Sequence, residues 1–142
     1  MKFIKQLLDS KGSQIWSVMP DNLVYDAIEL MAEKGVGALT VMQDEQLVGI
    51  ISERDYARKV ILKGRSSHMT PVSEIMTHDV ICTSPHDTVE ACMSVMTHKR
   101  IRHLPVKENN KLVGLISLGD LVKSIIAEQQ QVIDQLEHYI RG

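Results

Sequence analysis

Short apolar runs alternate along the chain with longer stretches in which apolar residues recur every three to four positions. The run Leu47–Ile51 predicts a buried strand, and Ser52 directly after it predicts the N-cap of a helix. Gly49, inside that run, indicates a close approach of another backbone segment or a bend. Helical spacing that starts at Val24 predicts a second kind of element, a helix that Gly35 ends.

The strand–helix unit Leu47–Asp55 returns as Leu112–Asp120, 65 residues further along the chain. The same offset aligns Pro20 with Pro85 without a gap, so the repeat extends well beyond this unit. Each copy is predicted to form strand, helix, strand, strand and helix, and holds too few apolar residues to close a core alone. The expected fold class is therefore α/β, with two tandem β-α-β-β-α repeats that pack on each other.

The first strand of each repeat is predicted at Ile15–Val18 and at Val80–Thr83, and Asp87 is predicted to cap the helix that follows. A long helical pattern from Ser124 to Ile140 continues past the second repeat. It can pack on the leading helix of its own chain or on a second subunit, and the sequence leaves both open. The predicted parts are a leading helix (1–14), repeat 1 (15–64), a linker with a short helix (65–79), repeat 2 (80–129) and a C-terminal helical extension (130–142).

Composition and charge narrow the classes of function. A net charge of −2 and an aromatic content of 4% provide neither the positive field nor the stacking surface that nucleic acid requires. No apolar run approaches the roughly 18 residues of a membrane span, and the N-terminus lacks the apolar run of a signal peptide, so a cytoplasmic protein is expected. Cys82 and Cys92 fit no zinc or redox spacing and are interpreted as reduced core thiols. The histidines form no metal-binding pattern, so no metal site is predicted.

The candidate chemistry lies where the repeated strand meets the repeated helix. Ser52 and Asp55 form a Ser-x-x-Asp pattern there, and Ser117 and Asp120 form it again. Free N–H groups at a helix N-terminus favour a phosphate, and an aspartate can accept two hydrogen bonds from a ribose diol. The plain alternative is that Ser-x-x-Asp caps its own helix and binds nothing. Its presence in two copies favours the ligand site.

The stretch His98–His103 is the most positive part of the chain. Arginine can bind phosphate through two parallel hydrogen bonds, which makes Arg102 a candidate phosphate ligand. His103 is either a phosphate donor whose charge rises below about pH 6.5 or a buried structural histidine. A binding patch for nucleic acid is not indicated, because the stretch is short and contains no aromatic residue.

Taken together, these motifs resemble the CBS domain, a family named after cystathionine β-synthase, where it is a regulatory appendage. The resemblance rests on Pro85–Val89, Ile101–Val106 and Gly114–Asp120 with their first-half counterparts, and it covers nearly the whole chain. It implies two repeats with pseudo-twofold symmetry, assembly of such pairs into a homodimer, and adenosine nucleotides bound in two clefts between the repeats. AMP is the expected ligand, with ATP or NAD as alternatives.

The resemblance also implies which residues line each cleft, with the strand start of one repeat facing the Ser-x-x-Asp of the other. The first cleft would combine Thr83, Ile101, Arg102, His103 and Pro105 with Ser52, Arg54 and Asp55. The second would combine Ser17, Val36, Gly37 and Ala38 with Ser117 and Asp120. Because the second cleft has small neutral residues where the first has Arg102 and His103, the first is expected to bind phosphate more tightly.

The function expected from these features is a regulatory sensor that binds an adenosine nucleotide and transmits the bound state to a protein partner. The alternative is a structural dimerisation scaffold with vestigial clefts. An enzyme is not expected, because the sequence shows no nucleophile–base pair, Gly-rich phosphate loop or cluster of metal ligands. No catalytic cofactor is implied.

Overall fold

The computed structural model describes residues 2–12 and 14–141, and the chain divides into two compact units. The first-repeat unit consists of Gln14–Ile81 and Asn109–Val113. The second-repeat unit consists of Met1–Ser13, Cys82–Glu108 and Gly114–Gly142. The leading helix therefore belongs with the second repeat, although 70 residues of chain separate them.

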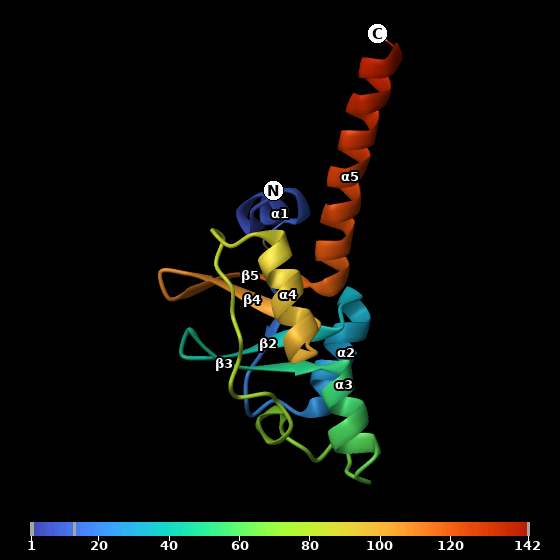
Figure 1. The fold of residues 1–142 in the computed structure, drawn as a ribbon. Coiled ribbons are helices and arrows are strands. Elements are labelled where there is room, and N and C mark those ends of the chain that lie inside the picture. The colour runs from blue at the N-terminus through green and yellow to red at the C-terminus, as the bar shows by residue number, and fades with distance from the viewer. Residues whose placement is uncertain (1, 13, 142) are drawn as a thin grey trace. The chain divides into compact units, whose positions relative to one another are not determined.

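The first-repeat unit is built on a three-stranded sheet in the order β1-β2-β3 (Figure 1). β1 runs parallel to β2, and β2 runs antiparallel to β3. Its elements are β1 (Ser17–Val18), α2 (Val24–Lys34), β2 (Ala38–Gln43), β3 (Gln46–Ser52), α3 (Glu53–Tyr56), η1 (Ala57–Ile61) and η2 (Val72–Glu74). The π-helical η1 continues directly from α3, so the helix predicted after Ser52 is present.

Local sequence explains where these elements end. α2 ends at Gly35, which adopts the left-handed conformation that glycine tolerates best. Asp44 and Glu45 both have positive φ and form the tight turn between β2 and β3. The core of the unit is formed by apolar side chains of the helix and the sheet, and Leu39, Val41 and Ile51 are fully buried there.

The second-repeat unit contains a two-stranded sheet, β4-β5, and three helices. Its elements are α1 (Ile4–Lys11), α4 (Val89–Lys99), β4 (His103–Glu108), β5 (Lys111–Ser117, which belongs to this unit from Gly114 on) and α5 (Leu118–Arg141). Ile4, Leu7 and Leu8 of α1 are buried, and the backbone N–H of Ile4 donates to the carbonyl oxygen of Asp87 at 2.9 Å. The leading helix is thus an integral part of this unit.

Two predicted features of the second repeat are wrong. Val80–Thr83 is not a strand, because only Thr83 forms a bridge, parallel to Val106. The N-cap of α4 is Thr88, whose hydroxyl accepts from the N–H of Ala91 at 3.1 Å. Asp87 instead closes the preceding turn, since its carboxylate accepts from the Thr83 hydroxyl at 2.6 Å and from a neighbouring backbone N–H.

One of the two cysteines differs from the prediction. Cys92 is buried as expected, whereas Cys82 is exposed, and neither forms a disulfide within the described part of the chain. Burial is the main cause that raises the pKa of each thiol, so both stay protonated at neutral pH.

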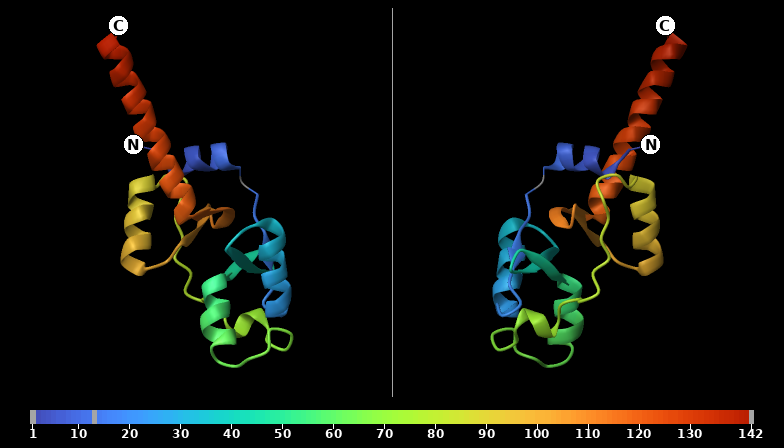
Figure 2. Two further views of the ribbon diagram at one scale, coloured as in Figure 1. Left: turned by 90° about the vertical axis from the view of Figure 1, so that its right-hand side faces the viewer. Right: turned by 90° about the vertical axis from the view of Figure 1, so that its left-hand side faces the viewer.

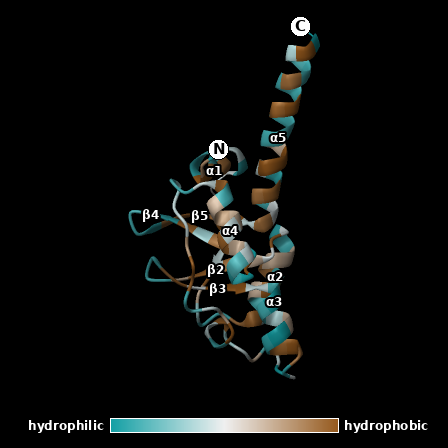
Figure 3. Cartoon of the chain, in the orientation of Figure 1, coloured by the Kyte–Doolittle hydropathy of each residue, from teal (hydrophilic) through white to brown (hydrophobic). Residues whose placement is uncertain are grey.

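The long helix α5 packs against α1 and α4 and extends beyond them (Figures 1 and 2). Leu121 and Ser124 are buried near its start, whereas residues 129–141 are exposed, so a second subunit as the partner of this exposed part stays a prediction. Apolar and polar turns alternate along its C-terminal half (Figure 3), and Ile133, Leu136 and Ile140 are exposed there. None of the helices in the described part of the chain is long and apolar enough to cross a membrane.

Candidate functional site

Each repeat has a capping turn, Ser52–Asp55 in the first and Ser117–Asp120 in the second. The Ser52 hydroxyl accepts from the N–H of Asp55 at 3.2 Å, and the Asp55 carboxylate accepts from the N–H of Ser52 at 2.9 Å. The equivalent bonds of the second turn measure 3.1 Å and 2.8 Å. Both turns are therefore reciprocal capping boxes, which hold each aspartate at the N-terminus of its helix.

Each capping turn lies beside a strand start, Gly37–Ala38 in the first repeat and Arg102–His103 in the second. The N–H of Glu53 donates to the carbonyl oxygen of Gly37 at 3.0 Å. In the same way, the N–H of Leu118 donates to the carbonyl oxygen of Arg102 at 2.8 Å. The two bonds are equivalent under the 65-residue repeat, so the duplicated sequence builds the same backbone frame twice.

The predicted pairing of each capping turn with the strand start of the other repeat stays a prediction. Within its own repeat, each capping turn is joined to the strand start by a backbone hydrogen bond. The reason is the antiparallel pairing of β2 and β3, which brings the end of β3 next to the start of β2, with Ala38 opposite Ser52. Asp55 therefore lies near Gly37 and Ala38, and Asp120 lies near Arg102 and His103.

Other predicted residues are occupied within their own unit. Ser17 shares a 2.5 Å hydrogen bond with the buried Thr40, so its hydroxyl is held at the sheet. The Thr83 hydroxyl is bonded to Asp87, and its N–H donates to the carbonyl of Pro105 at 2.9 Å. Val36 packs against the core of the first-repeat unit. Ile101 and Arg54 are half-buried, while Arg102 is exposed at the surface.

Lysine ammonium groups already contact both aspartates. Lys59, one turn further along the same helix, lies 3.2 Å from the Asp55 carboxylate. In the second repeat the corresponding position is Ser124, and Lys11 from α1 reaches the Asp120 carboxylate at 2.6 Å. Lys11 also donates to the carbonyl oxygen of Leu115 at 2.6 Å. Lys11 was not predicted from the sequence. One signal could have suggested it: Ser124 stands where the repeat would place a lysine equivalent to Lys59, so a cation for Asp120 has to come from elsewhere.

The charges around Asp120 shift the pKa values of two groups. Burial alone raises the pKa of Asp120, but hydrogen bonds from Lys11 and from the Ser117 backbone outweigh it and lower the pKa below its ordinary value. Burial is the largest cause that lowers the pKa of His103, and Lys11 and Arg102 lower it further against the opposing effect of Asp120. At neutral pH the site therefore holds a carboxylate, an ammonium, a guanidinium and a neutral imidazole.

The described residues contain no group of three histidine, cysteine, aspartate or glutamate side chains placed to hold a metal ion. What the capping turns offer instead is a carboxylate acceptor, backbone N–H groups at a helix start and nearby cations. These groups can bind a polyol and an anion at the same place.

Comparison with known proteins identifies the repeated unit. The family model described as the CBS domain matches residues 11–62 and 72–127. A putative signal-transduction protein with CBS domains from Burkholderia ambifaria is 51% identical in sequence, and its solved structure matches with a TM-score of 0.87 over 90% of this chain and 96% of that chain. The mitochondrial CBS domain-containing protein CBSX3 of Arabidopsis thaliana is 41% identical over 136 residues. The match covers 92% of this chain and 66% of the plant protein's length.

A more distant solved structure shares the fold. The CBS domain pair of protein MJ0100 matches with a TM-score of 0.80 at 20% identity, over 90% of this chain and 98% of that chain. That pair was solved in complex with 5'-methylthioadenosine and S-adenosyl-L-methionine.

Proposed function

This chain belongs to the CBS domain family, and we propose that it is a non-catalytic regulatory module that binds an adenosine nucleotide at its capping turns. AMP is the first candidate ligand, with ATP and NAD as alternatives. Asp55 and Asp120 would accept hydrogen bonds from the ribose diol. The bound state would be transmitted to a protein partner that remains to be identified.

The observation that carries the proposal is the duplicated frame of capping turn and strand start. In both repeats the first N–H of the helix donates to the carbonyl oxygen of Gly37 or Arg102, and the capping box holds a carboxylate at the helix start beside the start of a strand. A helix N-terminus attracts phosphate through its dipole. The MJ0100 pair supports the ligand class, because its two ligands both contain adenosine.

The two sites should differ in their affinity for phosphate. Each aspartate has a lysine, Lys11 at Asp120 and Lys59 at Asp55, but the second strand start carries Arg102 where the first has Gly37. The guanidinium would offset the desolvation of a phosphate, and a small neutral residue would not. We therefore assign the tighter nucleotide site to Asp120, which keeps Arg102 at the tighter site, as the sequence predicts, but pairs it with Asp120 in place of Asp55.

A dimerisation scaffold with vestigial sites is the second candidate, and one observation favours it. Each aspartate carboxylate already has partners, because it accepts from the backbone N–H of its serine and forms an ion pair with a lysine. A ligand must replace or share these bonds. The scaffold would keep the capping boxes for helix stability alone.

A thermal melt of the purified protein separates these two functions. AMP, ATP and NAD would each be added, with GMP as the non-adenine control. A ligand at a hundredfold excess over its dissociation constant stabilises the folded form by about 2.7 kcal/mol, which corresponds to roughly 5–10 °C in Tm. If no adenosine ligand raises Tm beyond GMP, the scaffold replaces the sensor.

The variant Asp120→Asn sharpens this experiment, because asparagine keeps an acceptor for the N–H of Ser117 but loses the negative charge. Losing a charge-assisted hydrogen bond weakens binding about ten- to hundredfold. Asp55→Asn should cost less if the second repeat holds the tighter site. A cytoplasmic location stays a prediction, and the plant relative is described as mitochondrial.

A further inference from the structure

Lys11 is the last residue of α1 and lies outside the repeated sequence. Its ammonium donates to the Asp120 carboxylate and to the Leu115 carbonyl oxygen, both at 2.6 Å. The helix that carries it is fixed by the burial of Ile4 and Leu7. The lysine is therefore held at the second capping turn by packing elsewhere on its helix.

The ion pair conflicts with the binding of a ribose at Asp120. One carboxylate oxygen, Oδ2, accepts from both Lys11 and the N–H of Ser117. A ribose diol that donates to both carboxylate oxygens would compete with the ammonium at Oδ2, because the two lone pairs of that oxygen are already used. Lys11 would then keep only its hydrogen bond to the Leu115 carbonyl oxygen. Its ammonium would lie in a partly buried region, where the Asp120 side chain is 20% exposed and the Arg102 guanidinium adds a second positive charge.

We propose that Lys11 makes the second site selective for adenosine ligands that carry their own negative charge, an inference that rests on the proposed function. A nucleotide supplies a phosphate to the ammonium that its ribose has displaced. A neutral nucleoside takes the carboxylate and leaves the ammonium without an anion, which costs free energy in a partly buried site. Selectivity arises because the lysine must exchange one anion for another.

The first repeat provides an internal contrast. Lys59 lies 3.2 Å from Asp55, but its side chain is 44% exposed, compared with 36% for Lys11. It also donates to the Ile75 carbonyl at 2.9 Å, and no arginine or histidine stands at the strand start beside it. Selectivity for charged ligands should therefore be weaker at Asp55 than at Asp120.

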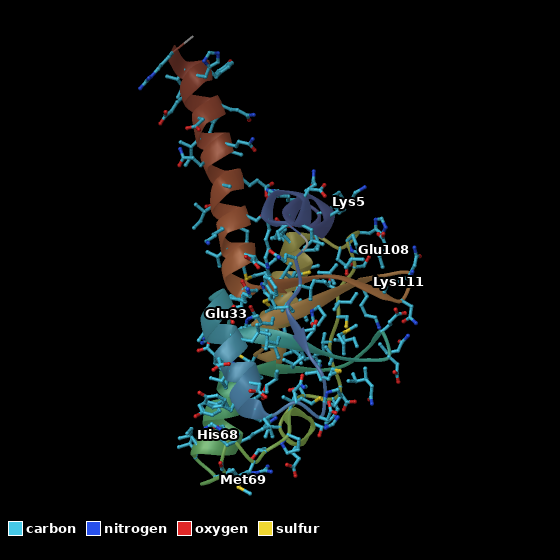
Figure 4. The ribbon with its side chains drawn as sticks, turned by 180° about the vertical axis from the view of Figure 1, so that it is seen from behind. Lys5, Glu33, His68, Met69, Glu108 and Lys111 are labelled. Carbon is cyan, nitrogen blue, oxygen red and sulfur yellow. The ribbon has the colours of Figure 1, made fainter. Side chains whose placement is uncertain are left out.

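The test compares AMP with adenosine by titration calorimetry. All proteins carry Asp55→Asn, so that the second site dominates the binding signal while the Ser52 cap keeps its acceptor. Lys11→Met removes the charge and keeps the aliphatic stem, and Lys11→Arg restores a cation. Lys5→Met is the matched control, since Lys5 is an exposed lysine on the same helix (Figure 4).

In the Lys11→Met protein the preference for AMP over adenosine should fall roughly tenfold, which corresponds to one charge-assisted hydrogen bond. Lys11→Arg and Lys5→Met should keep the preference of the parent. An unchanged preference in Lys11→Met, with AMP still bound, overturns the role of Lys11 and leaves the proposed function standing. If the parent binds neither AMP nor adenosine, the proposed function and the inference fail together. A thermal melt of each variant verifies that it is folded.

Discussion

Gly49 lies in β3 at a point where another segment of the first-repeat unit comes very close. A methyl group added at this position would stand 2.5 Å from the sulfur of Met76 and 3.0 Å from the carbonyl oxygen of Thr77. Thr77 is held there by two backbone hydrogen bonds with Ile50, of 3.1 Å and 2.9 Å. The substitution Gly49→Ala therefore pushes against a segment that cannot retreat without weakening those bonds.

The expected cost follows from these contacts. Overpacking of a filled core costs about 1–3 kcal/mol, and disturbing the bonds to Thr77 adds to that. Replacing glycine with alanine returns about 0.4–1 kcal/mol, because the unfolded chain has fewer conformations to lose. The net destabilisation by Gly49→Ala should be about 2 kcal/mol, or roughly 6 °C in Tm.

The matched control is Gly114→Ala, the equivalent position of the second repeat. There the added methyl group would meet only the side chain of Leu8, at 2.7 Å and 3.2 Å from its methyl carbons. A leucine side chain can rotate away, so this variant should lose about 1 kcal/mol or less. Urea unfolding followed by circular dichroism measures both. If Gly49→Ala is as stable as the parent, or less damaging than Gly114→Ala, the close approach of Thr77 does not limit this position.

Two further predictions concern pH and self-association. His103 has a lowered pKa in the folded protein, so its contribution to stability is complete above about pH 6.5 and is lost as the pH falls through the folded pKa. Tm should drop between pH 7 and 5, and His103→Asn should make that drop smaller; an equal drop would contradict the assignment. The predicted homodimer should use the exposed apolar face of α5, so Leu136→Glu should lower the mass measured by light scattering, while Gln135→Glu should not. A parent of monomer mass at micromolar concentration would exclude this dimer.

Local patterns were sufficient to predict most of the fold. Helical spacing and Gly35 located α2, and the run around Gly49 located β3 together with the close approach that the glycine permits. The prediction failed at Val80–Thr83, whose apolar composition is typical of a strand. Of these four residues only Thr83 forms a β-bridge, which is parallel to Val106. Strand formation depends on a partner strand, which a local sequence cannot reveal.

The capping turns were predicted from the sequence, whereas their role as a ligand site stays a prediction. The repeat located Ser52, Asp55, Ser117 and Asp120, and all four form the capping boxes that their spacing favours. The neighbours that lie within the same repeat were not predicted, because the expected pairing was taken from a resemblance and not from the register of the strands. An antiparallel connection through a two-residue turn must bring the end of β3 beside the start of β2.

Lys11 shows how a duplicated sequence can produce two unequal sites. The backbone arrangement recurs in both repeats because it is held by hydrogen bonds between main-chain atoms, such as those that Gly37 and Arg102 accept, and these do not depend on the side chains. The charges are not copied. The first aspartate has a lysine on its own helix, whereas the lysine of the second comes from α1, which is held by the burial of Ile4 and Leu7 and by the backbone bond from Ile4 to Asp87. Any event that loosens α1 would therefore remove a cation from the second site, whereas Lys59 stays on the same helix as Asp55.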